Sequence, residues 1–110
     1  MSHYAEDVEL VVDPDAFLNG GTFKGREAVG QWFADWFTTF EPGYAFEIDE
    51  AWDLGDLVVL TASHHGRGRI SGVEVHGRTG YLYRLRGGKI VRVELHPGRA
   101  EALEAAGLPQ

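Results

Sequence analysis

The chain has 110 residues, of which 44% are hydrophobic and 12% aromatic, and it contains no cysteine. This length allows one core and predicts one domain over residues 1–110, while the lack of cysteine excludes disulfides and thiolate chemistry. The formal net charge of −7 argues against a nucleic-acid partner, because phosphates usually meet a basic face. The longest apolar run, LVVLTA, is too short to cross a membrane, and no basic start precedes an apolar stretch. We therefore expect a cytoplasmic protein without a membrane partner.

The first part of the chain predicts a strand, a loop and a helix. Residues 1–6 are expected to form a loose tail, and DVELVV to form a short strand. The segment DPDAFLNGGTFKG is rich in Gly, Asp and Asn and predicts a loop. The period then changes to that of an amphipathic helix in GREAVGQWFADWFTTF, which Pro42 and Gly43 end. Its apolar stripe consists of Val29, Trp32, Phe33, Trp36, Phe37 and Phe40.

Four strands joined by short turns follow the helix. We predict them in YAFEIDEAWD, LVVLTASHH, VEVHGRTGYLYRLR and KIVRVELH. The segment GRGRISG predicts a turn between the second and third of them, because it lacks the strand-to-helix context of a phosphate-binding loop. Gly87 and Gly88 predict a tight hairpin turn, and Gly77 and Gly80 a bulge or bend. The first of these strands should present one apolar face, made by Tyr44, Phe46, Ile48 and Trp52.

A short helix in GRAEALEAA should end the chain, with Gly107 as its left-handed C-cap and Leu108 in contact with it. Hairpin connections predict a mostly antiparallel sheet, and hence an α+β fold. A long sheet of this kind curls, so that the aromatic helix can pack on its concave side and leave a cone-like pocket.

Five segments taken in order carry a family resemblance: GTFKGREAVGQWF, GDLVVL, GRGRISGVEV, YRLRGGKIVRVE and RAEALEAAGL. Together they resemble the SnoaL-like branch of the nuclear transport factor 2-like superfamily over residues 7–108. The resemblance implies a pocket for a small, largely apolar molecule and self-association as a homodimer or larger assembly through the outer sheet face. It does not fix a reaction, because the superfamily includes polyketide cyclases, ketosteroid isomerases, limonene epoxide hydrolases, dehydratases and binding modules.

Members of the family usually begin with one or two helices before the first strand, whereas only MSHYAE stands there in this chain. Either the start is truncated or a partner subunit covers the gap. This departure favours a module that binds or dimerises without catalysis and whose pocket is vestigial.

Catalytic members carry inward-pointing polar groups on two late strands. By resemblance, Ser63 and His65 stand where the epoxide-hydrolase type has an arginine and an acid, and Glu94 stands where it has a second acid. That acid–arginine–acid set is therefore not intact. Because strand side chains alternate, we expect Ser63 and His65 to point into the pocket and His64 to point away. His65 and Glu94 would then be the catalytic pair, with either one as the proton-transfer group.

Other roles for these residues stay open. His65 can be an exposed strand-end histidine, and Glu94 can form ordinary cross-strand ion pairs with Arg92, Arg84 or Arg78. A metal set of His65, Glu94 and His96 is conceivable, but no spacing requires it, so we predict neither metal nor cofactor. The candidate substrate-binding residues are Trp32, Trp36, Phe46, Trp52, Ser63, Tyr81 and Tyr83.

The sequence leaves two functions open. One is a cofactor-free isomerase, cyclase or hydrolase that acts on a polyketide-, steroid- or terpenoid-like ligand by general acid–base chemistry. The other is a non-catalytic binding or dimerisation module with a vestigial pocket. A catalytic pocket should bury His65 and Glu94 within hydrogen-bonding distance, whereas side chains should fill a vestigial one.

Overall fold

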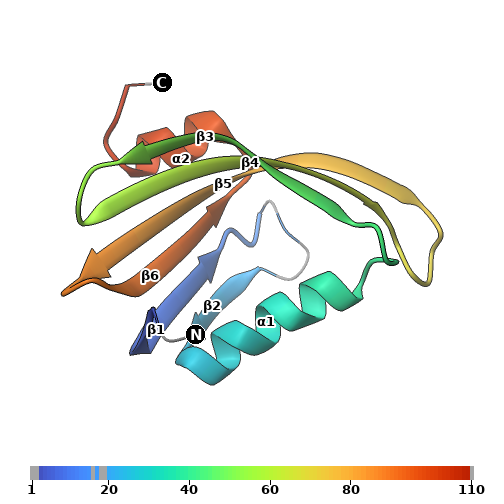
Figure 1. The fold of residues 1–110 in the computed structure, drawn as a ribbon, viewed down its shortest axis with the longest axis horizontal. Helices are drawn as coiled ribbons and strands as arrows, with labels where there is room; N and C mark the ends of the chain where they lie inside the picture. The colour runs from blue at the N-terminus through green and yellow to red at the C-terminus, as the bar shows by residue number, and fades with distance from the viewer. Residues whose placement is uncertain (1–2, 16, 18–19, 110) are drawn as a thin grey trace.

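The computed structural model describes residues 3–15, 17 and 20–109. The described residues form one curled sheet of six strands and two helices (Figure 1). In chain order the elements are β1 (Tyr4–Val12), β2 (Gly21–Lys24), α1 (Arg26–Thr38), β3 (Ala45–Asp53), β4 (Leu57–Arg67), β5 (Glu74–Arg86), β6 (Lys89–His96) and α2 (Arg99–Ala105).

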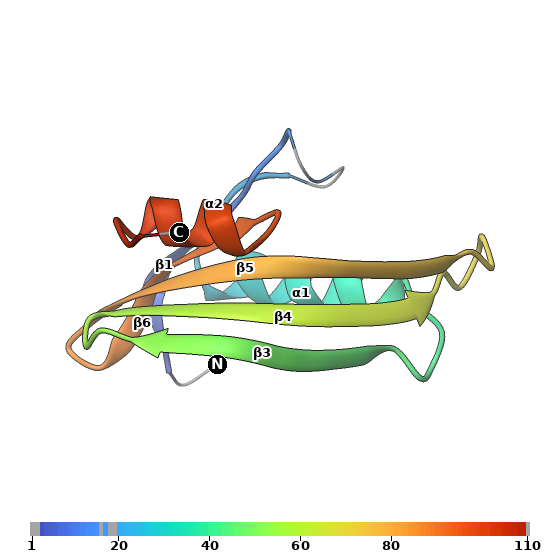
Figure 2. The ribbon, with the colours of Figure 1, turned by 90° about the horizontal axis from the view of Figure 1, so that it is seen from above.

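The sheet has the strand order β2-β1-β6-β5-β4-β3, and all neighbouring pairs are antiparallel except β1 and β6. Helix α1 packs on the concave side of the sheet, and α2 packs on the convex side (Figures 1 and 2). The predicted α+β class, with a curled and mostly antiparallel sheet, is therefore confirmed. No helix among the described residues is both long enough and apolar enough to cross a membrane.

The two helices bury apolar residues on opposite faces of the sheet. On the concave face, Val29 and Trp32 of α1 join a core with inward residues of β1 and β6. On the convex face, Ala102 and Leu103 of α2 pack against Val59 of β4. Central strands that are covered on both faces need apolar residues in consecutive positions, which explains the run LVVLTA in β4.

Two expectations for the first part of the chain are wrong. Strand β2 lies within the segment predicted as a loop, and it pairs antiparallel with β1 from Glu9↔Lys24 to Val12↔Gly21. Its four residues are too few to show a period in the sequence. The predicted tail is also shorter than expected, because residues 4–6 belong to β1; residues 1–2 lie outside the described part of the chain.

A β-bulge in β3 changes the faces that its side chains occupy. The register between β3 and β4 shifts between Ile48 and Glu50, so Asp49 is the extra residue. After the shift, Trp52 pairs with Val59 and joins the cluster under α2 on the convex face. The prediction that Trp52 shares a face with Phe46 is therefore wrong.

The predicted turn and cap glycines are confirmed. Gly87 and Gly88 have φ values of 59° and 78°, the left-handed conformation that a type I′ hairpin requires. Gly107 has φ 76° and follows α2, where its N–H donates to the Glu104 carbonyl at 3.0 Å. The N–H of Leu108 donates to the Leu103 carbonyl at 2.9 Å, which completes a Schellman motif with the expected hydrophobic contact.

Arg69, in the β4–β5 connection, binds the carboxyl end of α1. Its backbone N–H donates to the Thr39 carbonyl at 2.8 Å, and its guanidinium donates to the carbonyls of Thr38 and Phe40 at 3.3 and 3.1 Å. A cation at a helix C-terminus satisfies carbonyls that lack helical partners. We expect Arg69→Ala to lower the free energy of unfolding by about 1 kcal/mol in urea denaturation.

A matched control is Arg86→Ala, because Arg86 makes an ion pair with Asp7 at 3.7 Å in which both side chains are about three-quarters exposed. This variant should show no measurable loss of stability. Equal losses in the two variants would contradict the role assigned to Arg69.

Candidate functional site

The concave face of the sheet holds a cavity of about 200 Å³ whose described lining residues are all aromatic. We call it the aromatic cavity. Helix α1 closes one side of it, and strands β1, β3 and β5 supply the rest. Its lining residues are Tyr4, Trp32, Phe33, Trp36, Phe37, Phe46, Tyr81 and Tyr83.

Two stacked pairs of rings give the cavity its walls. Trp32 and Trp36, one helical turn apart on α1, lie with their ring planes 3° from parallel and their centroids 6.0 Å apart. Tyr81 and Tyr83, two residues apart on β5, stack at 6.3 Å and 16°. Phe46 of β3 meets Tyr81 edge-on at 6.0 Å. Helical and strand periodicities therefore bring rings from distant segments to one space.

The tyrosine hydroxyls of the cavity remain protonated near neutral pH. Burial raises the pKa of Tyr81 to about 12, with a further contribution from Tyr44. Burial and the neighbouring Tyr4 and Tyr81 raise the pKa of Tyr83 further still. Protonated phenols can donate hydrogen bonds to a ligand while they remain uncharged.

His64 is the histidine that β4 directs toward the concave side. It packs against Trp36 and Tyr44 with ring centroids 6.1 and 5.9 Å apart, and its Nε2 lies 3.5 Å from the hydroxyl of Thr79. Its Nδ1 is buried and has no hydrogen-bond partner among the described residues. Burial lowers the pKa of His64, so the imidazole is neutral near pH 7.

Gly77, directly opposite His64 on β5, provides the space for this imidazole. A Cβ atom at residue 77 would lie 3.0 Å from Nε2 of His64. His64 was not predicted from the sequence, because the alternation along β4 was assigned the wrong phase.

His65, Ser63 and Trp52 all lie on the convex face, so their predicted placement in the pocket is wrong. His65 is exposed and stacks on His76, its cross-strand partner, with ring centroids 5.9 Å apart. The hydroxyl of Ser63 donates to the Asp49 carboxylate at 2.6 Å. The other five predicted binding residues, namely Trp32, Trp36, Phe46, Tyr81 and Tyr83, line the aromatic cavity.

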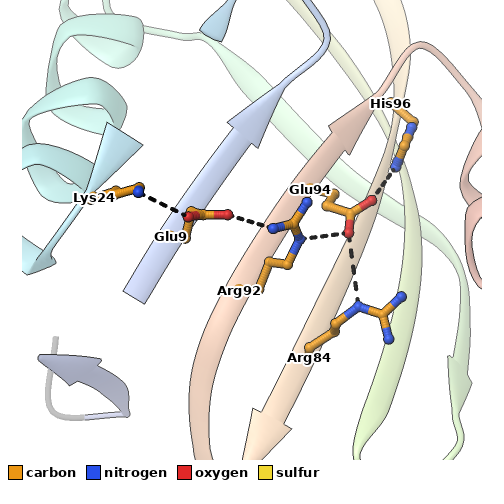
Figure 3. Close-up of polar contacts among 6 residues, drawn as sticks. All are labelled: Glu9, Lys24, Arg84, Arg92, Glu94 and His96. Carbon is orange, nitrogen blue, oxygen red and sulfur yellow. Dashed lines mark hydrogen bonds and ion pairs between the residues drawn. The ribbon is translucent and has the colours of Figure 1, made fainter. Parts of the chain in front are cut away.

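Glu94 lies at the centre of an ionic network on the convex face (Figure 3). Arg92 Nε donates to its carboxylate at 2.9 Å, His96 Nε2 lies 3.0 Å from the other oxygen, and Arg84 Nε lies 3.8 Å away. Arg92 also binds Glu9, which pairs with Lys24 at 3.9 Å. Burial acts to raise the pKa of Glu94, but the hydrogen bonds and charges of Arg92 and His96 outweigh it and hold the pKa below its usual value.

His65 and Glu94 do not meet. His65 pairs with His76 and Glu94 pairs with Leu82, six positions further along β5, which corresponds to about 20 Å along the strand. Because of the same separation, His65 cannot bind one metal ion together with Glu94 and His96. Within the described part of the chain, no three histidine or carboxylate groups are placed to hold a metal ion.

Comparisons with known proteins agree with this architecture. The family model described as a SnoaL-like domain matches residues 1–93. A search of the curated proteins found no match. The fold and the resemblance predicted from the sequence are thus confirmed.

Three solved structures illustrate the similarity. A hypothetical protein with a ketosteroid isomerase-like fold from Catenulispora acidiphila, in complex with trimethylamine, is 26% identical, with a TM-score of 0.73 over 98% of this chain and 79% of that one. An NTF2-like protein from Burkholderia thailandensis is 26% identical, with a TM-score of 0.76 over 99% and 82% of the two chains. TerC, co-crystallised with polyporic acid, is 23% identical, with a TM-score of 0.69 over 94% and 79%.

Proposed function

Since this chain belongs to the SnoaL-like domain family, we propose that it binds a small, largely apolar organic molecule in the aromatic cavity. The observation that carries the proposal is the cavity itself, a space of about 200 Å³ that the surrounding side chains leave open and that aromatic residues line throughout the part that the structure describes. Concave apolar pockets with a few polar groups are typical of small-molecule sites. The hydroxyls of Tyr81 and Tyr83 supply such groups here.

The size of the cavity limits the ligand. A dry apolar cavity of about 150 Å³ admits a single benzene ring. A space of about 200 Å³ therefore fits a one-ring molecule or a compact branched group, while a larger ligand would extend through the mouth. Phe37 and Phe46 stand at that mouth, each about half exposed. In the 26% identical structure from Catenulispora acidiphila, a molecule of this small size, trimethylamine, is present.

A catalytic role is a second candidate, and His64 is the observation that favours it. A neutral imidazole with an unpartnered, buried Nδ1 next to an apolar cavity is suited to act as a base that takes up a proton from a substrate and then returns it. The site would then perform cofactor-free isomerase, cyclase or hydrolase chemistry. His64 is not among the described lining residues but contacts Trp36, which is one of them, so a substrate would need to move past that ring to reach His64. The catalytic roles predicted for His65 and Glu94 stay untested, and their separation gives them no support.

The competing interpretation is a non-catalytic binding or dimerisation module. Binding without turnover, unchanged by His64→Gln, would favour the module, whereas loss of turnover with intact binding would favour catalysis by His64. Self-association also stays a prediction, which light scattering after size-exclusion chromatography would test.

We expect compact ligands to stabilise the protein in a thermal-shift screen. The panel contains one-ring ketones, terpenoids and alkylammonium salts, with a steroid as a size control. Ligands that bind only the folded state raise its melting temperature by mass action. Compact members should raise the melting temperature more than the steroid does, and Phe46→Ala, which removes a half-exposed wall of the cavity, should reduce the shift.

Ile70→Ala is the matched control, because Ile70 is an equally apolar and fully exposed residue in the β4–β5 connection, outside the aromatic cavity. It should leave the shift unchanged. A panel in which no member raises the melting temperature, or a shift that Phe46→Ala leaves intact, would overturn the proposal.

A further inference from the structure

The walls of the aromatic cavity differ from those of an ordinary apolar pocket, because the described residues that form them are all aromatic and none is aliphatic. An aromatic ring carries partial negative charge on its faces and partial positive charge on its edge. A ring face therefore attracts a cation, whereas an aliphatic wall of equal area does not. Whether the walls of a cavity are aromatic or aliphatic therefore affects how well the cavity binds a positively charged ligand.

Aromatic rings line the cavity from two sides. The stacked pair Trp32–Trp36 lies on α1, and the stacked pair Tyr81–Tyr83 lies on the sheet, and both pairs line the same space. Tryptophan presents the most attractive face to a cation, and tyrosine follows. A group held between helix and sheet would contact rings of both pairs.

The lining is free of groups that repel a positive charge, as far as the structure describes it. The described residues that line the cavity include no lysine, arginine or histidine. Because burial keeps the phenols of Tyr81 and Tyr83 protonated, the described lining holds no fixed anion that would select a metal ion or a small hydrated cation. The net charge of −7 on the whole chain favours the approach of a cation from solvent.

We propose that the occupant of the aromatic cavity carries a compact organic cation, a tertiary or quaternary alkylammonium group, held by the rings of the two stacked pairs and of Phe46, which contacts Tyr81. This inference rests on the proposed function and names the class of its ligand. An alkylammonium head is apolar on its outside and weakly hydrated, so it can enter an apolar space at far lower cost than an ammonium ion. A cavity of about 200 Å³ accommodates such a head and leaves its substituent at the mouth.

The test compares choline with its uncharged carbon isostere, in which a tert-butyl group replaces the trimethylammonium head. Both have the same shape, so a difference in affinity reports the charge. Titration calorimetry on the full chain, with sodium chloride balancing the ionic strength, should show choline bound about tenfold more tightly.

Two variants replace aromatic faces by aliphatic bulk. In Phe46→Leu and Trp36→Leu the preference for choline should fall severalfold, while the isostere should bind as in the parent. Phe46 is half exposed, so its replacement keeps the test valid if the Trp36 variant fails to fold.

The possible outcomes separate this inference from the proposed function. If the isostere binds as tightly as choline, the cation inference is overturned while ligand binding in the cavity stands. If choline is preferred but neither variant weakens that preference, the cation is bound elsewhere and the inference is again overturned. If neither molecule binds and the thermal-shift panel is also silent, both proposals fail.

Discussion

Replacing Glu94 by alanine is expected to lower the free energy of unfolding by about 2 kcal/mol. Only 14% of the Glu94 side chain is exposed, and its carboxylate contacts Arg92, His96 and Arg84. Without it, three cationic or ionisable groups would lie close together with too little negative charge among them. Because both arginines are 38% or more exposed, the loss should be smaller than for a fully buried ion pair. Urea denaturation followed by circular dichroism measures it.

The contribution of Glu94 should also depend on pH. The pKa of Glu94 lies below its usual value in the folded protein, because the hydrogen bonds and charges of Arg92 and His96 outweigh the effect of burial. A group with a depressed folded pKa stabilises the protein fully above its unfolded pKa, which is near about 4.3, and this stabilisation is lost as the pH falls through the folded pKa. The difference in unfolding free energy between the parent and Glu94→Gln should therefore be largest above about pH 5 and shrink in more acidic solution.

Glu50→Ala is the matched control for Glu94→Ala. Glu50 also accepts a hydrogen bond from an arginine, Arg99, at 2.9 Å, but both side chains are about half exposed. Its replacement should cost less than about 0.5 kcal/mol. If Glu94→Ala kept the stability of the parent and instead abolished a turnover that the parent shows, the structural role assigned here to Glu94 would be refuted in favour of catalysis.

The sequence predicted the elements that have a clear period or a clear stop signal. The predicted helix in GREAVGQWFADWFTTF contains α1, because its apolar stripe recurs at helical spacing and Pro42 stops it. The last two strands and α2 follow from the Gly87–Gly88 turn and from Gly107. Strand β2 was missed because its four residues contain too little pattern, and its pairing with β1 depends on contacts between separate segments.

The candidate site was predicted only in part because the sequence of β4 does not mark its faces. Alternation shows which side chains share a face, but LVVLTA is apolar in both phases, since α1 and the aromatic cavity cover one face of the sheet and α2 covers the other. The choice between His64 and His65 therefore depended on family resemblance, which placed on the concave side the histidine that lies on the convex face. The bulge at Asp49, which moves Trp52 to the other face, likewise has no signal in the sequence.

The aromatic cavity was predicted better than the polar groups around it. Five of the residues predicted to bind ligand line it. Large aromatic side chains on one face of a helix and on one face of β5 are buried where the helix packs on the sheet, which is the concave side. The sequence predicts Phe33 and Phe37 in the helix stripe and Tyr4 in a tail, and it places none of the three among the binding residues. How these side chains share one space depends on the curvature of the sheet.

Gly80→Ala is expected to lower the free energy of unfolding by about 2 kcal/mol. A Cβ atom at residue 80 would lie 2.5 Å from the carbonyl oxygen of Gly98 and 2.6 Å from the Cβ of Ala102. That carbonyl accepts the 3.2 Å hydrogen bond from the Ala102 N–H, so an added methyl group pushes on the backbone at the start of α2. The helix must shift and expose part of its contact with Val59. Urea denaturation measures the loss, and faster hydrogen exchange in α2 locates it.

The matched control on the same strand is Gly77→Ala. We predicted a bulge or bend at Gly77 and Gly80, but the register with β4 is unbroken from Glu74 to Arg84, and neither glycine has a positive φ. Both glycines instead leave space on the surface of the sheet, Gly77 for a side chain and Gly80 for a helix backbone. Because the His64 ring can give way by a few tenths of an ångström, Gly77→Ala should cost less than about 1 kcal/mol. Equal losses in the two variants would indicate that an alanine at either position destabilises the strand itself. The contact of Gly80 with α2 would then not explain the loss of stability in Gly80→Ala.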